Sequence, residues 1–165
     1  MSRQRVRRQT GASLMTALIF LIVMAMLSVT LANVTTLEER MAGNTRDRDI
    51  ALQAAEAALR DAEQRLSKPA FRATGFPAFI ATNENSAAFW EDCFRPPALP
   101  PCNTTYEPVQ KLPTLGPGAV SAQPRFVIER KPNVGTTEIY RVTARAVGGD
   151  EDTIVVLQTE LGVTP

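Results

Sequence analysis

The sequence predicts an α+β protein in which one long N-terminal helix packs on a C-terminal antiparallel sheet. All twelve prolines lie at or after Pro69, so nothing earlier in the chain forbids a continuous helix. An uncharged apolar run fills residues 12–37 of that helix. Near the C-terminus, three segments with the composition of β-strands are separated by turn residues.

The apolar run at residues 12–37 follows a short basic segment that ends at Gly11. As a helix it would be about 39 Å long at roughly 1.5 Å per residue, which exceeds the ~30 Å hydrocarbon core of a bilayer. It therefore predicts a membrane anchor. A cut after Gly11 would remove residues 1–11 as a leader and keep the anchor. The alternatives are an uncleaved anchor and a conventional secretory signal, for which Thr30-Leu31-Ala32 is a poor cleavage site.

The charge around the apolar run predicts its orientation. Four arginines precede it, and basic segments stay on the cytoplasmic side of the inner membrane. We therefore expect a single-pass protein whose C-terminal part faces the outside of the membrane. Without these four residues Lys+Arg falls from 18 to 14 against 17 Asp+Glu, a formal charge of 14 minus 17, or -3. Such a charge gives no indication of nucleic-acid binding.

Residues 38–68 are rich in strong helix formers and predict an amphipathic continuation of the helix. Gly43-Asn44 leaves two alternatives there: a bend or local melting, or a helix that runs through at a cost of about 1 kcal/mol for the glycine. Apolar residues recur at alternating spacings of three and four, which predicts a stripe that needs a partner surface. The stripe consists of Leu52, Ala55, Leu59, Ala62 and Leu66.

Charged residues of this segment predict surface positions. Two pairs have the i,i+4 spacing of helical ion pairs, Glu56 with Arg60 and Asp61 with Arg65. The alternating run at residues 46–49, Arg-Asp-Arg-Asp, predicts a solvated helix face, with pairing to a neighbouring chain as the alternative.

Residues 69–165 predict a small globular domain. Up to residue 125 it is rich in proline and predicts loops, with a short helix at 85–89. The predicted strands are 125–129, 138–146 and 153–161. In the second strand apolar and polar residues alternate, which is typical of a half-buried strand. Its apolar set is Tyr140, Val142, Ala144 and Ala146, and its polar set is Arg141, Thr143 and Arg145.

The two cysteines of the chain, Cys93 and Cys102, predict a disulfide, because an even count in an exported protein is typical of one. Closing a loop of about ten residues would stabilise the domain by about 2.5 to 3 kcal/mol. Free thiols are an alternative. A zinc site is less favoured, because the chain has no histidine and two thiolates are too few ligands. We expect Trp90 in the core beneath this loop.

Other chemistry is sparse. The absence of histidine removes the commonest general base, so we expect a protein that is not an enzyme and needs no cofactor. The acidic clusters at 91–92 and 150–152 are candidate calcium ligands. Surface turns are the favoured interpretation, because adjacent carboxylates do not by themselves surround an ion. We therefore expect no metal site.

The whole layout of the chain resembles that of type IV pilins. The shared features are the basic leader, the uncharged helix, its amphipathic continuation, the terminal sheet and the cysteine-closed loop. The runs at residues 37–47 and 51–60 resemble PilX-type minor pilins. The likeness covers about residues 5–66, and in the remainder it is one of general layout. It implies a pilin-like fold and a minor pilin that joins or primes a type IV pilus. It also implies cleavage after Gly11 by a prepilin peptidase and methylation of the new Ala12 amine.

The resemblance also implies partners and a location. The partners are other minor pilins, the major pilin, the prepilin peptidase and the inner membrane, with a tip adhesin as a further candidate. The protein would first lie in the inner membrane, with its C-terminal domain in the periplasm, and would then enter the pilus at the cell surface. One alternative shares this layout, a minor pseudopilin of a type II secretion system. An alternative of a different class is a membrane-anchored periplasmic binding or accessory domain that never polymerises.

The chain departs from the usual pilin pattern at two positions. Pilins usually have phenylalanine or methionine first after the cut and glutamate fifth, whereas this chain has Ala12 and Thr16. In the family, the glutamate faces the terminal amine of a neighbouring subunit inside an apolar core. An unpaired charge there costs several kcal/mol. The threonine therefore resembles the pattern of minor subunits at a filament tip.

Overall fold

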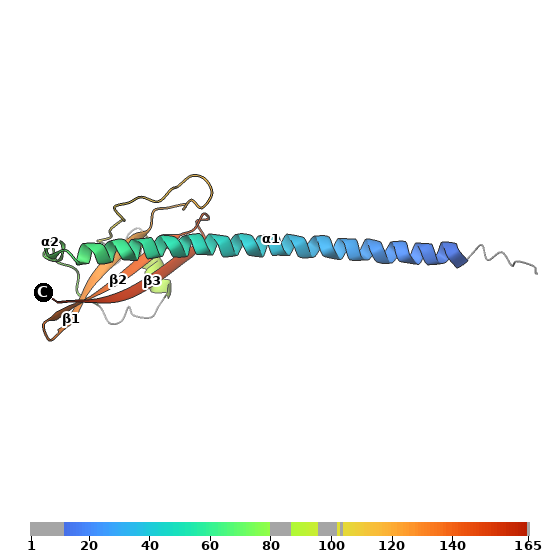
Figure 1. The fold of residues 1–165 in the computed structure, drawn as a ribbon. Helices are drawn as coiled ribbons and strands as arrows, with labels where there is room; N and C mark the ends of the chain where they lie inside the picture. Colours follow the sequence, from blue (N-terminus) through green and yellow to red (C-terminus); the bar gives the residue numbers. More distant parts are fainter. Residues whose placement is uncertain (1–11, 80–86, 96–101, 103, 165) are drawn as a thin grey trace, which may run out of the picture. The chain divides into compact units, whose positions relative to one another are not determined.

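The computed structural model describes residues 12–79, 87–95, 102 and 104–164 (Figure 1). The chain divides into two compact units, Met1–Gly43 and Asn44–Pro165. The elements are α1 (Ala12–Leu66), α2 (Pro69–Arg72), α3 (Ala87–Cys93), β1 (Arg125–Val134), β2 (Thr137–Val147) and β3 (Ile154–Val163). This confirms the predicted α+β class, with one long N-terminal helix and a three-stranded antiparallel sheet.

The described part of the first unit is helical throughout. Its hydroxyl side chains bond back to the helix backbone, as when Ser28 Oγ donates to the carbonyl of Met24 at 2.8 Å and Thr36 Oγ1 donates to that of Ala32 at 2.7 Å. Such bonds satisfy a hydroxyl without water. α1 continues through Gly43 and Asn44. This agrees with the alternative in which the helix runs through the glycine.

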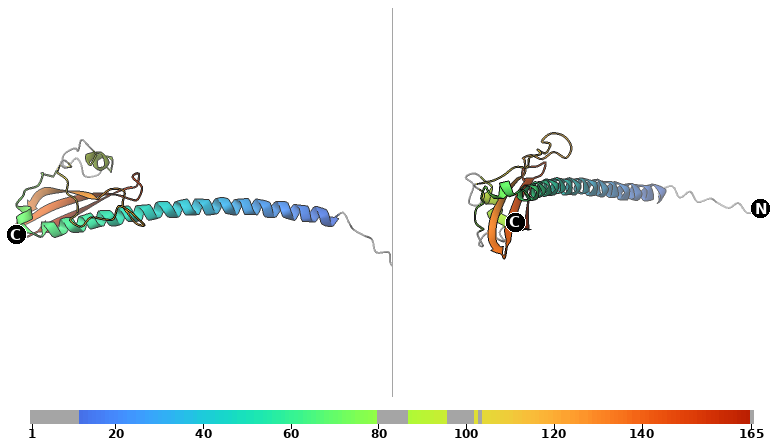
Figure 2. Two further views of the ribbon diagram at one scale, coloured as in Figure 1. Left: turned by 90° about the horizontal axis from the view of Figure 1, so that it is seen from above. Right: turned by 60° about the vertical axis from the view of Figure 1, so that its left-hand side comes forward.

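In the second unit, residues 44–66 of α1 pack on one face of a sheet with strand order β1-β2-β3. Figure 2 shows this part of the helix lying along the sheet. The main core cluster joins helix and sheet through Ala58, Ala62, Leu66, Phe126, Ile128, Tyr140, Val142 and Ala144. A second cluster extends it toward the other end of the sheet through Ala54, Ala55, Val120 and Ala146.

The predicted helix stripe was wrong in one of its members. Leu52 is 38% exposed, whereas Leu59 is partly buried and packs against the main core cluster. The residues that face the sheet are mostly alanines, because small side chains let the helix backbone approach the strands closely. The fully or almost fully buried set is Ala51, Ala54, Ala55, Ala58, Ala62 and Leu66.

The sheet differs from the prediction in its length and burial. β1 continues to Val134 with a register shift after Lys131, which accommodates Pro132. β2 is not half-buried, because Arg141 and Thr143 on its second face are 3% and 0% exposed. This face is covered by a cluster from α3 and the cysteine segment, made of Trp90, Cys93, Phe94 and Cys102 around Val127.

Two short helices precede the sheet. The helix predicted at 85–89 is found as α3, seven residues long from Ala87, while positions 85–86 lie outside the described residues. The four-residue α2 begins at Pro69, where the missing N–H of proline is not needed, and it was not predicted. Both predicted ion pairs of α1 form, Glu56–Arg60 at 3.0 Å and Asp61–Arg65 at 2.7 Å.

Candidate functional site

The apolar segment of α1, residues 12–37, is the candidate assembly site. Its large side chains are exposed, for example Leu14 at 72%, Phe20 at 68% and Leu31 at 67%. An 18-residue window in this helix reaches a mean hydropathy of 2.6, and by length and composition the helix could cross a membrane. Burying one large apolar side chain contributes about 1.5 to 3 kcal/mol. Apolar surroundings, such as the lipid tails of a bilayer, would therefore stabilise this segment.

The predicted processing residues lie at the start of this segment. Gly11 lies outside the described residues, and Ala12 is the first residue of α1. The Thr16 hydroxyl donates to the backbone carbonyl of Ser13 at 2.9 Å. Since residues 12–37 contain no acidic side chain, this stretch of helix has no carboxylate to offer a buried amine.

Asp47 connects α1 to the turn between β2 and β3. Its carboxylate accepts hydrogen bonds from the backbone N–H of Gly149 at 2.6 Å and of Asp150 at 3.2 Å. A hydrogen bond from the Thr153 side chain, together with those backbone bonds, lowers the pKa of Asp47 below its ordinary value, although desolvation opposes this. A Cβ at Gly148 would lie 2.7 Å from the backbone carbonyl oxygen of Asp47 and 2.6 Å from its Oδ2, so this close approach requires glycine. The prediction that residues 46–49 form a solvated helix face was therefore wrong for Asp47.

A buried ion pair joins β1 and β2 on the face away from α1. The Nε and Nη2 atoms of Arg141 lie 2.9 Å and 2.8 Å from Glu129 Oε2. The two side chains are 4% and 0% exposed. The guanidinium carbon lies 4.1 Å from the ring centre of Phe79 and 5.5 Å from that of Trp90. Sequence reasoning missed this pair; its only signal was two opposite charges inside predicted strands.

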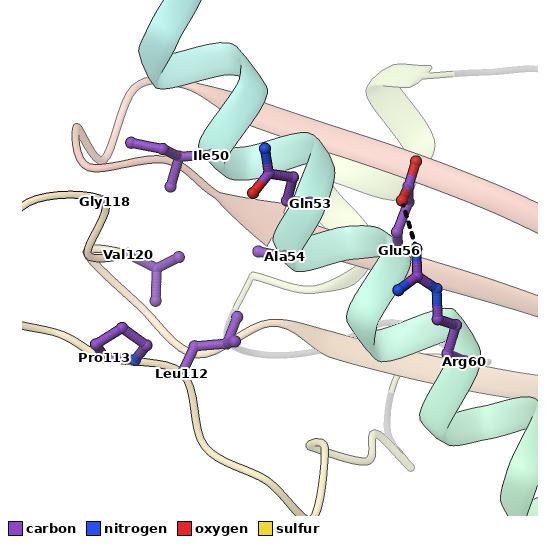
Figure 3. Close-up of a pocket in the computed structure, with 9 residues that line it drawn as sticks. All are labelled: Ile50, Gln53, Ala54, Glu56, Arg60, Leu112, Pro113, Gly118 and Val120. Carbon is purple, nitrogen blue, oxygen red and sulfur yellow. Dashed lines mark hydrogen bonds and ion pairs between the residues drawn. The ribbon is translucent and has the colours of Figure 1, made fainter.

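A groove runs between α1 and the segment before β1 (Figure 3). It has a volume of about 480 Å³. The side-chain amide of Gln123 bonds to both the N–H and the carbonyl of Leu112, at 3.0 Å and 2.8 Å, and so fixes that segment. The two charged lining residues, Glu56 and Arg60, pair with each other at 3.0 Å, and the lining has no serine, threonine, cysteine or lysine. The lining is Ile50, Gln53, Ala54, Glu56, Arg60, Leu112, Pro113, Gly118 and Val120.

Cys93 and Cys102 form the expected disulfide, with 2.02 Å between the sulfur atoms and 5.5 Å between the Cα atoms. This is incompatible with free thiols or a zinc site at these positions. Trp90 is 3% exposed in the same cluster, as expected.

The acidic clusters make local contacts. Asp92 pairs with Arg95 at 3.6 Å, and Asp150 Oδ1 accepts the backbone N–H of Asp152 at 3.3 Å. Within the described ranges, no group of three or more His, Cys, Asp or Glu residues could hold a metal ion.

Comparison with known families gave two matches that together span most of the chain. A family model described as PilX N-terminal matches residues 10–60. A second, described as type IV pilus assembly protein PilX C-term, matches residues 78–162. Neither the curated proteins nor the solved structures returned a match.

Proposed function

Because the chain belongs to the PilX family of type IV pilus assembly proteins, we propose that it is a minor pilin, a structural subunit without catalytic activity that joins or primes the pilus. The observation that carries this proposal is the apolar segment, which exposes large side chains over about seven helical turns. Such a surface is suited both to a bilayer before assembly and to the helices of other pilins afterwards. The proposed direct partners are other minor pilins and the major pilin.

The proposal includes a processing step. Gly11 precedes the apolar segment rather than following it, so cleavage after Gly11 by the prepilin peptidase would leave the segment on the mature chain. Ala12 would then carry the new, methylated amine. The four preceding arginines support a cytoplasmic leader and a periplasmic C-terminal unit.

The mass of the membrane form tests this processing. We expect the purified, detergent-solubilised chain to begin at Ala12 with a methylated amine, and a Gly11→Asp variant to keep residues 1–11. The matched control is Gln9→Asn, which leaves the cleavage glycine in place. A wild-type chain that has lost the apolar segment as well would show ordinary signal cleavage and would contradict the proposal.

Thr16 supports a position at or near the filament tip. In the packing that the family resemblance implies, a glutamate at this position pairs with the terminal amine of the subunit assembled above it. Threonine is uncharged and would leave that amine buried and unpaired. A position with nothing above it avoids this cost, while the Ala12 amine can still receive a glutamate from the subunit below. Growth beneath the subunit is therefore allowed, which fits a role in priming assembly.

A further inference from the structure

The outer edge of β3 has no partner strand in the part of the chain that the structure describes. β3 stands at the end of the strand order β1-β2-β3, and each of its residues from Ile154 to Val163 lies opposite a residue of β2. In the ranges that the structure describes, no strand or isolated bridge pairs with its other edge. A row of backbone N–H and C=O groups therefore faces away from β2 along ten residues.

The other edge of the sheet, on β1, is closed by the chain itself. Ala78 forms a parallel bridge with Arg130, and Tyr106 forms an antiparallel bridge with Phe126. The backbone hydrogen bonds of these bridges are 2.8 to 3.0 Å long. Pro132 and the register shift beside it also interrupt β1. Among the described residues, extended segments thus protect the β1 edge, and none covers the outer edge of β3.

The composition of β3 lacks the usual protection of an edge strand. It contains no proline, lysine or arginine, and Glu160 is its one charged residue. Edge strands are ordinarily protected by such residues or by a covering segment. A long edge without them is a template for pairing with another chain.

The side chains around this edge indicate what would cover it. Those of β3 that face α1 are only partly buried, whereas Val142, Ala144 and Ala146 in the adjacent strand are 0% exposed. The apolar layer under α1 therefore ends at β3 with part of its surface in contact with solvent. A fourth strand with apolar residues on this side would bury that surface. The β3 residues concerned are Val155, Leu157, Leu161 and Val163.

We propose that the outer edge of β3 accepts an extended segment of a different protein of the pilus as a fourth strand, an inference that rests on the proposed function. The segment would have apolar residues on the α1 side and a lysine or arginine beside Glu160. The Glu160 side chain is 53% exposed and pairs with Lys131 at 2.6 Å on its inner side. A second copy paired through its own β3 has no basic residue to offer there, which favours a different partner.

Hydrogen–deuterium exchange of the full chain in detergent tests the inference. The chain produced alone is compared with the chain co-purified from cells that make the whole pilus system. We expect the outward-facing amides among residues 154–163 to exchange roughly tenfold or more slowly in the complex, with residues 125–134 unchanged. A complex that leaves β3 unchanged would overturn the inference and spare the proposed function. Absence of any complex would contradict both, and protection that rises with concentration of the chain alone would identify a second copy instead.

Two proline variants examine the backbone directly. Neighbouring residues of a strand direct their N–H groups to opposite sides. Of the two variants Gln158→Pro and Thr159→Pro, one therefore removes an N–H that points away from β2 and keeps the hydrogen bonds to β2, and the other removes an N–H that bonds to β2. The variant that keeps the wild-type unfolding temperature has lost only the outward N–H, and it is the one to test. Alanine at the same position is its control. In complexes from cells that make the whole pilus system, we expect β3 of this proline variant to lose its protection from exchange while the alanine variant keeps it, because the apolar segment of α1 can still hold the complex together. Unchanged protection of β3 in a folded proline variant would contradict strand addition, and the wild-type exchange experiment decides if neither variant folds.

Discussion

Asp47 shows how one side chain positions a distant part of this chain. Its hydrogen bonds reach backbone groups about a hundred residues later, at Gly149 and Asp150. They fix the β2–β3 turn against α1, and Gly148 leaves the space for this contact. A local pattern of alternating charge carries no information about a partner so far along the sequence. The role of Asp47 therefore required the fold to be known.

This carboxylate predicts a pH-dependent part of the stability. Because the folded pKa of Asp47 lies below its ordinary value of 3.8, its contribution is complete above that pH and is lost as the pH falls toward the folded pKa. We expect Asp47→Asn to destabilise the C-terminal unit by about 1 kcal/mol at pH 7, since the contact is partly exposed to solvent. The difference from wild type should shrink below about pH 4.

Thermal unfolding between pH 3 and 7 measures this effect, with fluorescence of Trp90, the single tryptophan, as the signal. Asp49→Asn on the same helix is the matched control, because Asp49 is exposed. An Asp47→Asn difference that stays constant down to pH 3 would contradict the assigned role.

The Glu129–Arg141 pair predicts a different energetic pattern. Glu129→Gln leaves the Arg141 charge buried between aromatic rings, and we expect a loss of about 3 to 5 kcal/mol. Replacing both residues by leucine should cost less than the single change, because no charge is then left unpaired. Urea unfolding of the two variants measures the comparison. A double variant less stable than Glu129→Gln would show that the pair itself is net stabilising.

At the scale of elements, the decisive feature is the alanine surface of α1. Spacings of three and four residues fit two adjacent stripes of this helix. The predicted stripe included Leu52, which lies outside the buried one. The sheet selects the stripe with small residues, since a close helix needs little side-chain volume. Similarly, the alternation in β2 correctly assigned residues to its two faces but not their burial. That depended on α3 and the disulfide covering the second face, which local periodicity does not reveal.

This account predicts opposite responses to two changes in α1. Ala58 is 0% exposed and lies in the main core cluster, so Ala58→Leu should overpack the contact and cost about 1 to 3 kcal/mol. Leu52→Ala, at a position 38% exposed, should change stability by less than about 0.5 kcal/mol. The free energy of unfolding of each full-length variant in detergent distinguishes them. If Leu52→Ala lost more stability than Ala58→Leu, the result would contradict this account and favour the stripe predicted from the sequence.

At the scale of the whole molecule, the order of parts could be predicted because each part has a local signature. The apolar segment, the amphipathic helix and the three strands were found from charge, proline position and alternation. The contacts that shape the C-terminal unit could not be predicted in the same way. The Asp47 turn contact, the buried Glu129–Arg141 pair and the open β3 edge all depend on how the elements pack.

The central proposal, a minor pilin at the filament tip, is tested most directly by locating the chain in sheared pili. Quantitative mass spectrometry should find it in trace amount relative to the major pilin, and immunogold labelling should mark filament ends. Thr16→Glu, which supplies the missing carboxylate, should preserve pilus number and allow labelling along the shaft, while Thr16→Ser should keep the label at the ends. Regular labelling along wild-type filaments, or absence of the chain from them, would contradict the account.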